Sequence, residues 1–385
     1  MQPFTPTAVR LDPRDGLDAL IGALAAEDYR VVGPVLRDGV VHYERVTGEA
    51  DLPTGLSVEQ APGRWRSHVD GAHRFAWTPA ADSWKRVVLP PQQEVLRIRR
   101  VDGTFVTTRP EVEAPVAMIG VRDCELRALA ILDRVELDHE HPDPRYAARR
   151  DGAFVVAVTC SVPASTCWCT SIGGGPRPTA DYDVRLTELD DADGHRLLAE
   201  AGSERGAAVL TRLVVGVSAT DPCDAPAAER VVERAVAAMP RRLPGEDLPE
   251  LLAGCDSDAH WDDVAGRCLS CGNCTMVCPT CFCSTFRDTT GLTDDGGPAE
   301  EVVRVQEWAS CFQLDHSAIG GRPVRAEVAD RYRQWLTHKL QHWHAQFGTA
   351  GCVGCGRCTT WCPAGIDLVA EAQHLLAARH SGVPS

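Results

Sequence analysis

The chain has 385 residues, more than one average domain, so we expect two packed units that each bury a hydrophobic core. It carries 39 Lys and Arg against 54 Asp and Glu, which gives a formal net charge of -15. This charge argues against a nucleic-acid partner and against binding to an anionic membrane surface.

The beginning of the chain, MQPFTPTAVRLDPRDG, has neither the basic start nor the apolar core of a signal peptide. The longest apolar runs, such as LVVGV, are too short to cross a bilayer. We therefore expect a cytoplasmic protein with no membrane contact. Its 17 cysteines are clustered, which in a cytoplasmic protein indicates metal binding rather than a disulfide framework.

The chain is predicted to divide near residue 250. Residues 1–250 have the pattern of a mixed α/β domain, and residues 251–385 that of a helical, cysteine-rich domain. The boundary falls in a stretch rich in Pro, Gly and Asp, MPRRLPGEDLPELLAGCDSD (239–258). In the first domain, Asp38-Gly39 and Asp102-Gly103 each lie between β-rich runs and predict two hairpins.

A strand-helix-strand unit is predicted in the middle of the first domain. The runs VAMIGV (116–121) and AFVVAV (153–158) are typical of buried strands. Between them, apolar residues recur at helical spacing: Leu126, Leu129, Leu132 and Val135. This order predicts a right-handed βαβ unit with parallel strands.

The second domain is predicted to contain a long helix from Glu327 to Phe347 and a solvated loop over GLTDDGGPAEE (291–301). On the helix, His338 and His342 are four positions apart, a spacing that suits metal binding or a proton relay. No third ligand is in register, so we favour an exposed face for them. Trp335 and Leu336 are among the apolar positions expected to pack inward.

Two copies of the motif C-x2-C-x2-C-x3-C-P carry the strongest signal. The first copy is Cys268, Cys271, Cys274, Cys278 and Pro279, and the second is Cys352, Cys355, Cys358, Cys362 and Pro363. This is the run of bacterial two-cluster ferredoxins, in which three cysteines of one copy and the fourth of the other hold each [4Fe-4S] cluster. The predicted ligand sets are therefore Cys268, Cys271, Cys274 and Cys362 for one cluster, and Cys352, Cys355, Cys358 and Cys278 for the other.

Three thiolates at three-residue intervals require a tightly curled backbone, which Gly272, Gly354 and Gly356 permit. The competing interpretations are tetrahedral zinc, a thiol-disulfide site and plain buried cysteines. Zinc sites usually separate their cysteine pairs by a longer loop, and redox C-x-x-C sites lack further cysteines at the same interval. The long separation of the two copies suits an α-helical ferredoxin with an insertion, so the predicted fold is an α/β (α+β) domain followed by an α-helical ferredoxin domain with two [4Fe-4S] clusters.

A third [4Fe-4S] cluster is predicted in the first domain. Cys124 follows one strand of the βαβ unit, and three thiols follow its parallel neighbour: Cys160, Cys167 and Cys169. Parallel strands end on one edge of a sheet, so the four thiols converge where α/β sheets bind ligands. The amino terminus of the helix is expected to favour the thiolate form of Cys124. The alternative is that these cysteines pack as small hydrophobic residues.

Other thiols leave the ligands of the third cluster open. The sequence TCFC (Cys281, Cys283) resembles TCWC (Cys167, Cys169), and Cys311 is also unassigned, so any of these could supply a ligand. We expect Cys223 and Cys255 to be structural. No dinucleotide fingerprint or P-loop occurs, and GGGP (173–176) is a turn-forming stretch. No catalytic residues can be assigned from spacing.

Several of these stretches together resemble a known family. They are CLSCGNCTMVCPTCFC, SCF (310–312), RYRQWLTHK, GCVGCGRCTTWCP, VRDCELRALAILDRV and TCWCTSIGGGP. They resemble the beta subunit of soluble NADP-linked nickel-iron hydrogenases, also called sulfhydrogenases. The A subunit of anaerobic sulfite reductase is similar in outline.

The hydrogenase resemblance implies a non-catalytic electron-transfer subunit in a heterotetramer. It would carry electrons between a flavin subunit that handles NADP(H) and the small subunit, which connects to the nickel-iron site of the large subunit. The absence of a nucleotide motif agrees with this division of labour. Two alternatives stay open: an electron-transfer subunit of a sulfite or sulfur reductase, and a non-catalytic iron-sulfur sensor, for which the acidic chain shows no DNA-binding segment.

Overall fold

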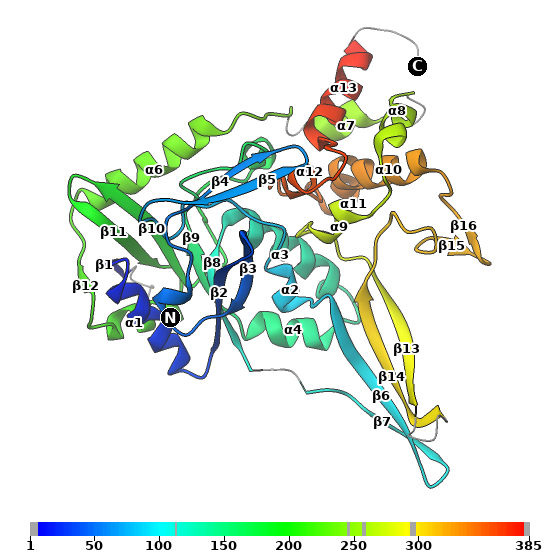
Figure 1. The fold of residues 1–385 in the computed structure, drawn as a ribbon, viewed down its shortest axis with the longest axis horizontal. Coiled ribbons are helices and arrows are strands. Elements are labelled where there is room, and N and C mark those ends of the chain that lie inside the picture. Colours follow the sequence, from blue (N-terminus) through cyan, green and yellow to red (C-terminus); the bar gives the residue numbers. More distant parts are fainter. Residues whose placement is uncertain (1–6, 112–113, 245–246, 256–258, 293–297, 381–385) are drawn as a thin grey trace.

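A computed structural model describes residues 7–111, 114–244, 247–255, 259–292 and 298–380. Its main element is an eight-stranded sheet with the order β12-β1-β11-β10-β9-β8-β2-β3 (Figure 1). The strands are β1 (Ala8–Leu11), β2 (Arg30–Arg37), β3 (Val40–Arg45), β8 (Val116–Val121), β9 (Phe154–Val158), β10 (Val184–Asp191), β11 (Gly194–Ala201) and β12 (Val217–Ala219). The central run β10-β9-β8-β2 is parallel, and the outer pairs are antiparallel.

The predicted βαβ unit is confirmed. Strands β8 and β9 are parallel neighbours, with Met118 opposite Val155. Helix α3 (Asp123–Glu136) connects them, together with α4 (Pro144–Asp151), which Asp143 caps through its side chain. Leu126, Leu129 and Leu132 are buried in α3, as their spacing predicts, because they face the sheet.

Both predicted hairpins are also confirmed. Asp38 and Gly39 join β2 to β3 with φ of 49° and 77°. Asp102 and Gly103 join β6 (Gln92–Val101) to β7 (Thr104–Thr108) with φ of 49° and 79°. Positive φ at both central residues is the backbone form that the Asp-Gly pair favours in two-residue turns.

A second sheet has the order β13-β14-β6-β7 and projects from the body of the molecule (Figure 1). Strand β14 (Pro298–Trp308) pairs with both β13 (Ser284–Leu292) and β6. The prediction of a loop over residues 291–301 was therefore wrong for 291–292 and 298–301, which belong to these strands; 293–297 lie outside the described residues. The reason is long-range pairing with β6, which no local pattern reveals. The division at residue 250 stays a prediction, and this sheet takes strands from both sides of it.

Helices cover both faces of the main sheet. On one face, α1 (Asp15–Ala25) and α5 (Glu204–Arg212) bury apolar residues such as Leu20 and Leu210. On the other face lie α3, α4 and the short α2 (Lys85–Val88), with Trp84 fully buried. Helix α6 (Asp224–Ala238) packs against β10 and β11, and the hairpin β4 (Leu56–Ala61) with β5 (Arg64–Val69) extends toward the second half of the chain. The carboxyl ends of the parallel strands remain free for a site.

The remaining helices form a separate hydrophobic cluster around the cysteine motifs. They are α7 (Leu248–Leu252), α8 (His260–Arg267), α9 (Asn273–Met276), α10 (Val328–Thr337), α11 (Trp343–Phe347), α12 (Arg357–Thr360) and α13 (Leu368–His380). A π-helical turn, His338–His342, joins α10 to α11, so the predicted long helix is confirmed. Trp335 and Leu336 are buried in the cluster, as expected. Along the described residues, no helix is both long and apolar enough to span a membrane.

Candidate metal centres

The thiols of the first predicted ligand set surround one pocket. Its lining includes Cys268, Cys271, Cys274 and Cys362. The backbone amides of Ser270 and Ile366 donate hydrogen bonds to the sulfur atoms of Cys268 and Cys362, each at 3.4 Å. Three thiols of the first motif and the last thiol of the second are therefore neighbours, as crossed ligation requires.

The thiols of the second predicted set are also neighbours. Burial raises the pKa of Cys358, and the adjacent thiols Cys352, Cys278 and Cys355 raise it further. The amide of Gly354 donates to the sulfur of Cys352 at 3.4 Å. Cys358 also lines the first pocket, and Cys274 acts on it electrostatically, so the two sets adjoin each other.

The predicted glycine turns are confirmed. Gly272, Gly354 and Gly356 have φ of 73°, 65° and 73°, in the left-handed region that favours glycine. A Cβ atom on Gly356 would lie 2.4 Å from the backbone oxygen of Thr166, and one on Gly354 would lie 2.6 Å from the backbone of Cys169. These glycines therefore permit both the curl of the second motif and its close contact with the amino-terminal part of the chain.

The four amino-terminal thiols of the proposed third set come together at the carboxyl edge of β8 and β9. Cys124 lies in the first turn of α3, Cys160 follows β9, and Cys169 begins the 3-10 turn Cys169–Ile172. Cys167 interacts electrostatically with both Cys160 and Cys169, and Cys124 with Cys167. The guanidinium of Arg122 donates to the sulfur of Cys160 at 3.2 Å. This convergence is the one that the parallel strands predict.

The expected effect of the helix terminus on Cys124 was wrong. Burial raises the pKa of this thiol well above its usual value, and the neighbouring Glu125 carboxylate raises it further. Desolvation therefore outweighs the favourable field of the helix amino terminus. A bound metal would have to displace the thiol proton, as thiolate ligation generally does.

The third set lies directly against the loop of the second motif. The thiol of Cys167 donates to the carbonyl oxygen of Cys355 at 3.6 Å, and the amide of Trp168 donates to the carbonyl of Gly354 at 2.8 Å. The structure thus holds three groups of thiols in a continuous series, in which the second set has a neighbour on each side.

Cys281, Cys283 and Cys311 do not join the amino-terminal thiols. They line another pocket, next to Lys339. Cys223 and Cys255, expected to be structural, lie apart from all of these groups: Cys223 donates to the carboxylate of Asp193 at 3.1 Å, and Cys255 is buried in the core of the helical cluster.

A buried ion pair joins the second motif to the first half of the chain, and sequence reasoning missed it. The guanidinium of Arg357 donates to the carboxylate of Glu125, and both side chains are 1% exposed. Arg357 also donates to the carbonyl of Ala80 at 2.8 Å, and Glu125 accepts from the amide of Trp84 at 3.1 Å. The only sequence signal was position: each charged residue lies beside a candidate ligand cysteine.

The two helical histidines differ in environment. His342 is exposed, as expected, but His338 is half-buried against the ring of Trp343, with ring centroids 5.4 Å apart. The expectation of an exposed face was therefore wrong for His338. Burial lowers the pKa of His338 to about 4, so its imidazole is neutral at pH 7.

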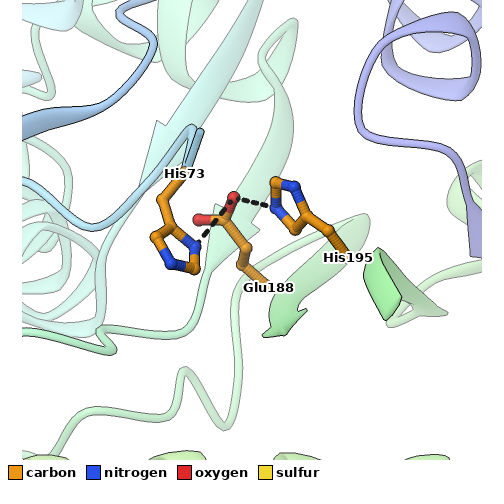
Figure 2. Close-up of side chains that lie close together, drawn as sticks. All are labelled: His73, Glu188 and His195. Carbon is orange, nitrogen blue, oxygen red and sulfur yellow. Dashed lines mark hydrogen bonds and ion pairs between the residues drawn. The ribbon is translucent and has the colours of Figure 1, made fainter. Parts of the chain in front are cut away.

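A second polar group that sequence reasoning missed joins β10 and β11 of the main sheet to the segment around His73 (Figure 2). Glu188 on β10 interacts with His195 on β11 at 2.8 Å and with His73 at 3.7 Å. Burial alone would raise the pKa of Glu188, but hydrogen bonds from these histidines and from the amides of Arg74 and Phe75 lower it to about 2. With its oxygens already satisfied, Glu188 serves to anchor residues 73–75 to the sheet.

Comparison with known proteins identifies an iron-sulfur domain in the second half of the chain. Residues 267–366 match the family described as a 4Fe-4S dicluster domain. Over 292 residues, 74% of this chain and 82% of its relative, the chain is 31% identical to sulfhydrogenase 2 subunit beta of Pyrococcus furiosus. The mixed α/β region is thus followed by a 4Fe-4S dicluster domain, and the protein belongs to the sulfhydrogenase beta subunit family.

Proposed function

We propose that this chain is the iron-sulfur electron-transfer subunit of a soluble hydrogenase complex. In this role it relays electrons between a flavin subunit that handles NADP(H) and the small subunit of a nickel-iron hydrogenase. The observation that carries the proposal is that the two ferredoxin-type thiol sets adjoin, because Cys358 of the second set lines the pocket of the first. Family membership supports the same role. The proposal includes a cytoplasmic location and an α-helical ferredoxin domain over residues 251–385.

The proposed clusters are three [4Fe-4S] centres. Cluster 1 is held by Cys268, Cys271, Cys274 and Cys362; cluster 2 by Cys278, Cys352, Cys355 and Cys358; cluster 3 by Cys124, Cys160, Cys167 and Cys169. Each set fits the group, because its thiols are neighbours and the turns around clusters 1 and 2 have the backbone form that such loops need. When bound, the clusters supply one-electron redox chemistry.

The protein's own residues set the order of the relay. Cys167 contacts the carbonyl of Cys355, and Cys358 adjoins Cys274, so the order is cluster 3, cluster 2, cluster 1. At the far end Cys271 is exposed and Leu269 is 66% exposed, which makes this edge the exchange point with one partner subunit. Between the ends, apolar and aromatic side chains exclude water, and backbone amides hydrogen-bonded to sulfur stabilise the thiolates.

Lys339 places a positive charge beside cluster 2, the middle cluster of the proposed relay. Its ammonium donates to the sulfur of Cys278 at 3.4 Å and to the hydroxyl of Thr280 at 3.0 Å. The side chain is 3% exposed, so its charge is poorly screened. A cation held against a ligand sulfur favours the reduced, more negative state of cluster 2.

Isolation of the complex tests the function. An affinity-tagged form of this chain, purified anaerobically with its bound subunits, should carry a nickel protein and a flavin protein, and hydrogen should drive NADP⁺ reduction. Replacing Cys271 by Ala should block this overall reaction and leave hydrogen-driven dye reduction by the nickel subunit unchanged. Cys223→Ser is the matched control and should leave both reactions intact. A sirohaem protein in place of the nickel protein, or oxidation of hydrogen or NADPH by this chain alone, would contradict the proposal.

A further inference from the structure

Three thiols outside the proposed relay gather at one pocket. Cys281 and Cys283 follow the first motif directly, and Cys311 comes after strand β14. The hairpin β13-β14 brings them together, because the amide of Ala309 donates to the carbonyl of Cys283 at 2.8 Å. All three thiols line this pocket. The pair Cys281 and Cys283 also repeats the Thr-Cys-x-Cys sequence of the amino-terminal thiols.

The three thiols do not lie close enough together to share a single metal ion. Four ligands of one zinc ion lie within about 4 Å of one another, given a metal-sulfur bond of about 2.3 Å. In the described parts of the chain, one group of three potential metal ligands is this compact. It consists of His73, Glu188 and His195, whose ligand atoms all lie within 4.8 Å of one another. The three pocket thiols do not form such a group. The thiols of the ferredoxin motifs do not form one either, and in a [4Fe-4S] cluster each thiolate binds a different iron.

Two buried lysines flank these thiols. Lys339 lines the pocket, and the ammonium of Lys85 donates to the carbonyl of Cys281 at 3.0 Å and lies 3.6 Å from the ring centroid of Trp308. Lys85 is 2% exposed, and burial lowers its pKa. Cys278 and Cys281 act electrostatically on both lysines. A thiolate-ligated cluster at this pocket would place an anion beside both buried lysine side chains.

A histidine completes the ligand set. His338 lines the same pocket from the π-helical turn, a backbone form that occurs frequently at functional sites. Histidine replaces cysteine as a ligand in some iron-sulfur centres. His316 also lines the pocket and provides a control.

We propose that Cys281, Cys283, Cys311 and His338 hold an additional [4Fe-4S] cluster beside cluster 2. Cys281 lies beside Cys278, a proposed ligand of cluster 2, so the added centre exchanges electrons with the middle of the relay. The relay then has a branch at cluster 2 in addition to its two ends.

Iron and acid-labile sulfide analysis of the full chain, purified anaerobically, tests this site without using enzyme activity. The wild-type chain should contain about sixteen irons, against about twelve with three clusters only. Cys283→Ser and Cys311→Ser should each lose about four irons and about four sulfides while the EPR signals of the other clusters remain. Cys223 is also half-buried, and Cys223→Ser should lose neither iron nor sulfide.

Two histidine variants test whether His338 is the fourth ligand. His338→Ala should change the EPR spectrum of the added cluster or deplete it, and His316→Ala should leave it unchanged. A wild-type content of about eight irons or fewer would overturn the proposal even if a cysteine variant does not fold, and so would full retention of iron and sulfide in Cys283→Ser and Cys311→Ser. Loss of a single metal without sulfide, in either cysteine variant, would overturn it too. The expected iron and sulfide contents do not depend on whether the chain belongs to a hydrogenase complex.

Discussion

Replacing Cys362 by Ala is expected to deplete cluster 1 and to leave cluster 2 in place. Cys362 belongs to the second motif by sequence, yet its thiol lines the pocket formed by Cys268, Cys271 and Cys274. Loss of one of four ligands in this partly open pocket should remove about four irons per chain. EPR of the reduced protein, together with iron analysis, measures the loss.

The matched variant is Cys278→Ala, which should have the opposite effect. Cys278 belongs to the first motif but adjoins Cys352, Cys355 and Cys358. It should therefore deplete cluster 2 and leave cluster 1. If Cys362→Ala instead removes the cluster bound by residues 352–358 and spares that of residues 268–274, ligation does not cross between the motifs.

Breaking the buried ion pair is expected to give the largest loss of stability. Glu125→Gln or Arg357→Met should each lower the free energy of unfolding by about 3–5 kcal/mol, because each leaves a charge or a polar group buried without its partner. Both side chains are 1% exposed, so solvent does not screen the remaining charge. Anaerobic urea denaturation, followed by tryptophan fluorescence, measures the change.

The controls for this prediction are a double variant and a surface pair. Glu125→Gln with Arg357→Met should cost less than the sum of the two single changes, because removing both partners leaves no isolated charge. The exposed pair Arg37 and Glu44 is 62% and 42% exposed, and Glu44→Gln should have little effect. Equal small losses at the buried and the exposed pair would contradict the stabilising role of Arg357 and Glu125.

The same pair has a consequence for the relay. Arg357 follows the cluster 2 cysteine Cys355, and Glu125 follows Cys124 of the third set. The ion pair therefore holds the loop of the second motif against the amino-terminal thiols. Variants that retain all clusters but lack this pair should show slower exchange of electrons between clusters 2 and 3.

The sequence was sufficient to predict features that depend on residues close together in the chain or on general properties of parallel strands. The Asp-Gly hairpins follow from residues that adopt positive φ, as Asp38 and Asp102 do. The convergence of Cys124 with Cys160 follows from a general property of parallel strands, whose carboxyl ends share one edge. The cysteine spacing alone predicts crossed ligand sets, and the thiols of each set lie side by side.

Long-range contacts could not be read from the sequence. Strand β14 pairs with β6 about two hundred positions away, so the stretch 291–301 looked like a loop. Arg357 and Glu125 are 232 positions apart, and nothing in either neighbourhood indicates the other. The helix-terminus argument for Cys124 failed for a related reason, because burial depends on how the whole chain packs around the thiol.

The most direct test of the relay is the iron content of the chain without its amino-terminal thiols. Iron and acid-labile sulfide, with EPR, should be measured anaerobically on the wild type, on Cys124→Ala with Cys160→Ala, and on the control Cys223→Ser. The account predicts that the double variant alone loses about four irons and four sulfides, together with one EPR signal. Unchanged iron in the double variant would contradict it, because electron transfer would then be confined to the carboxyl-terminal clusters.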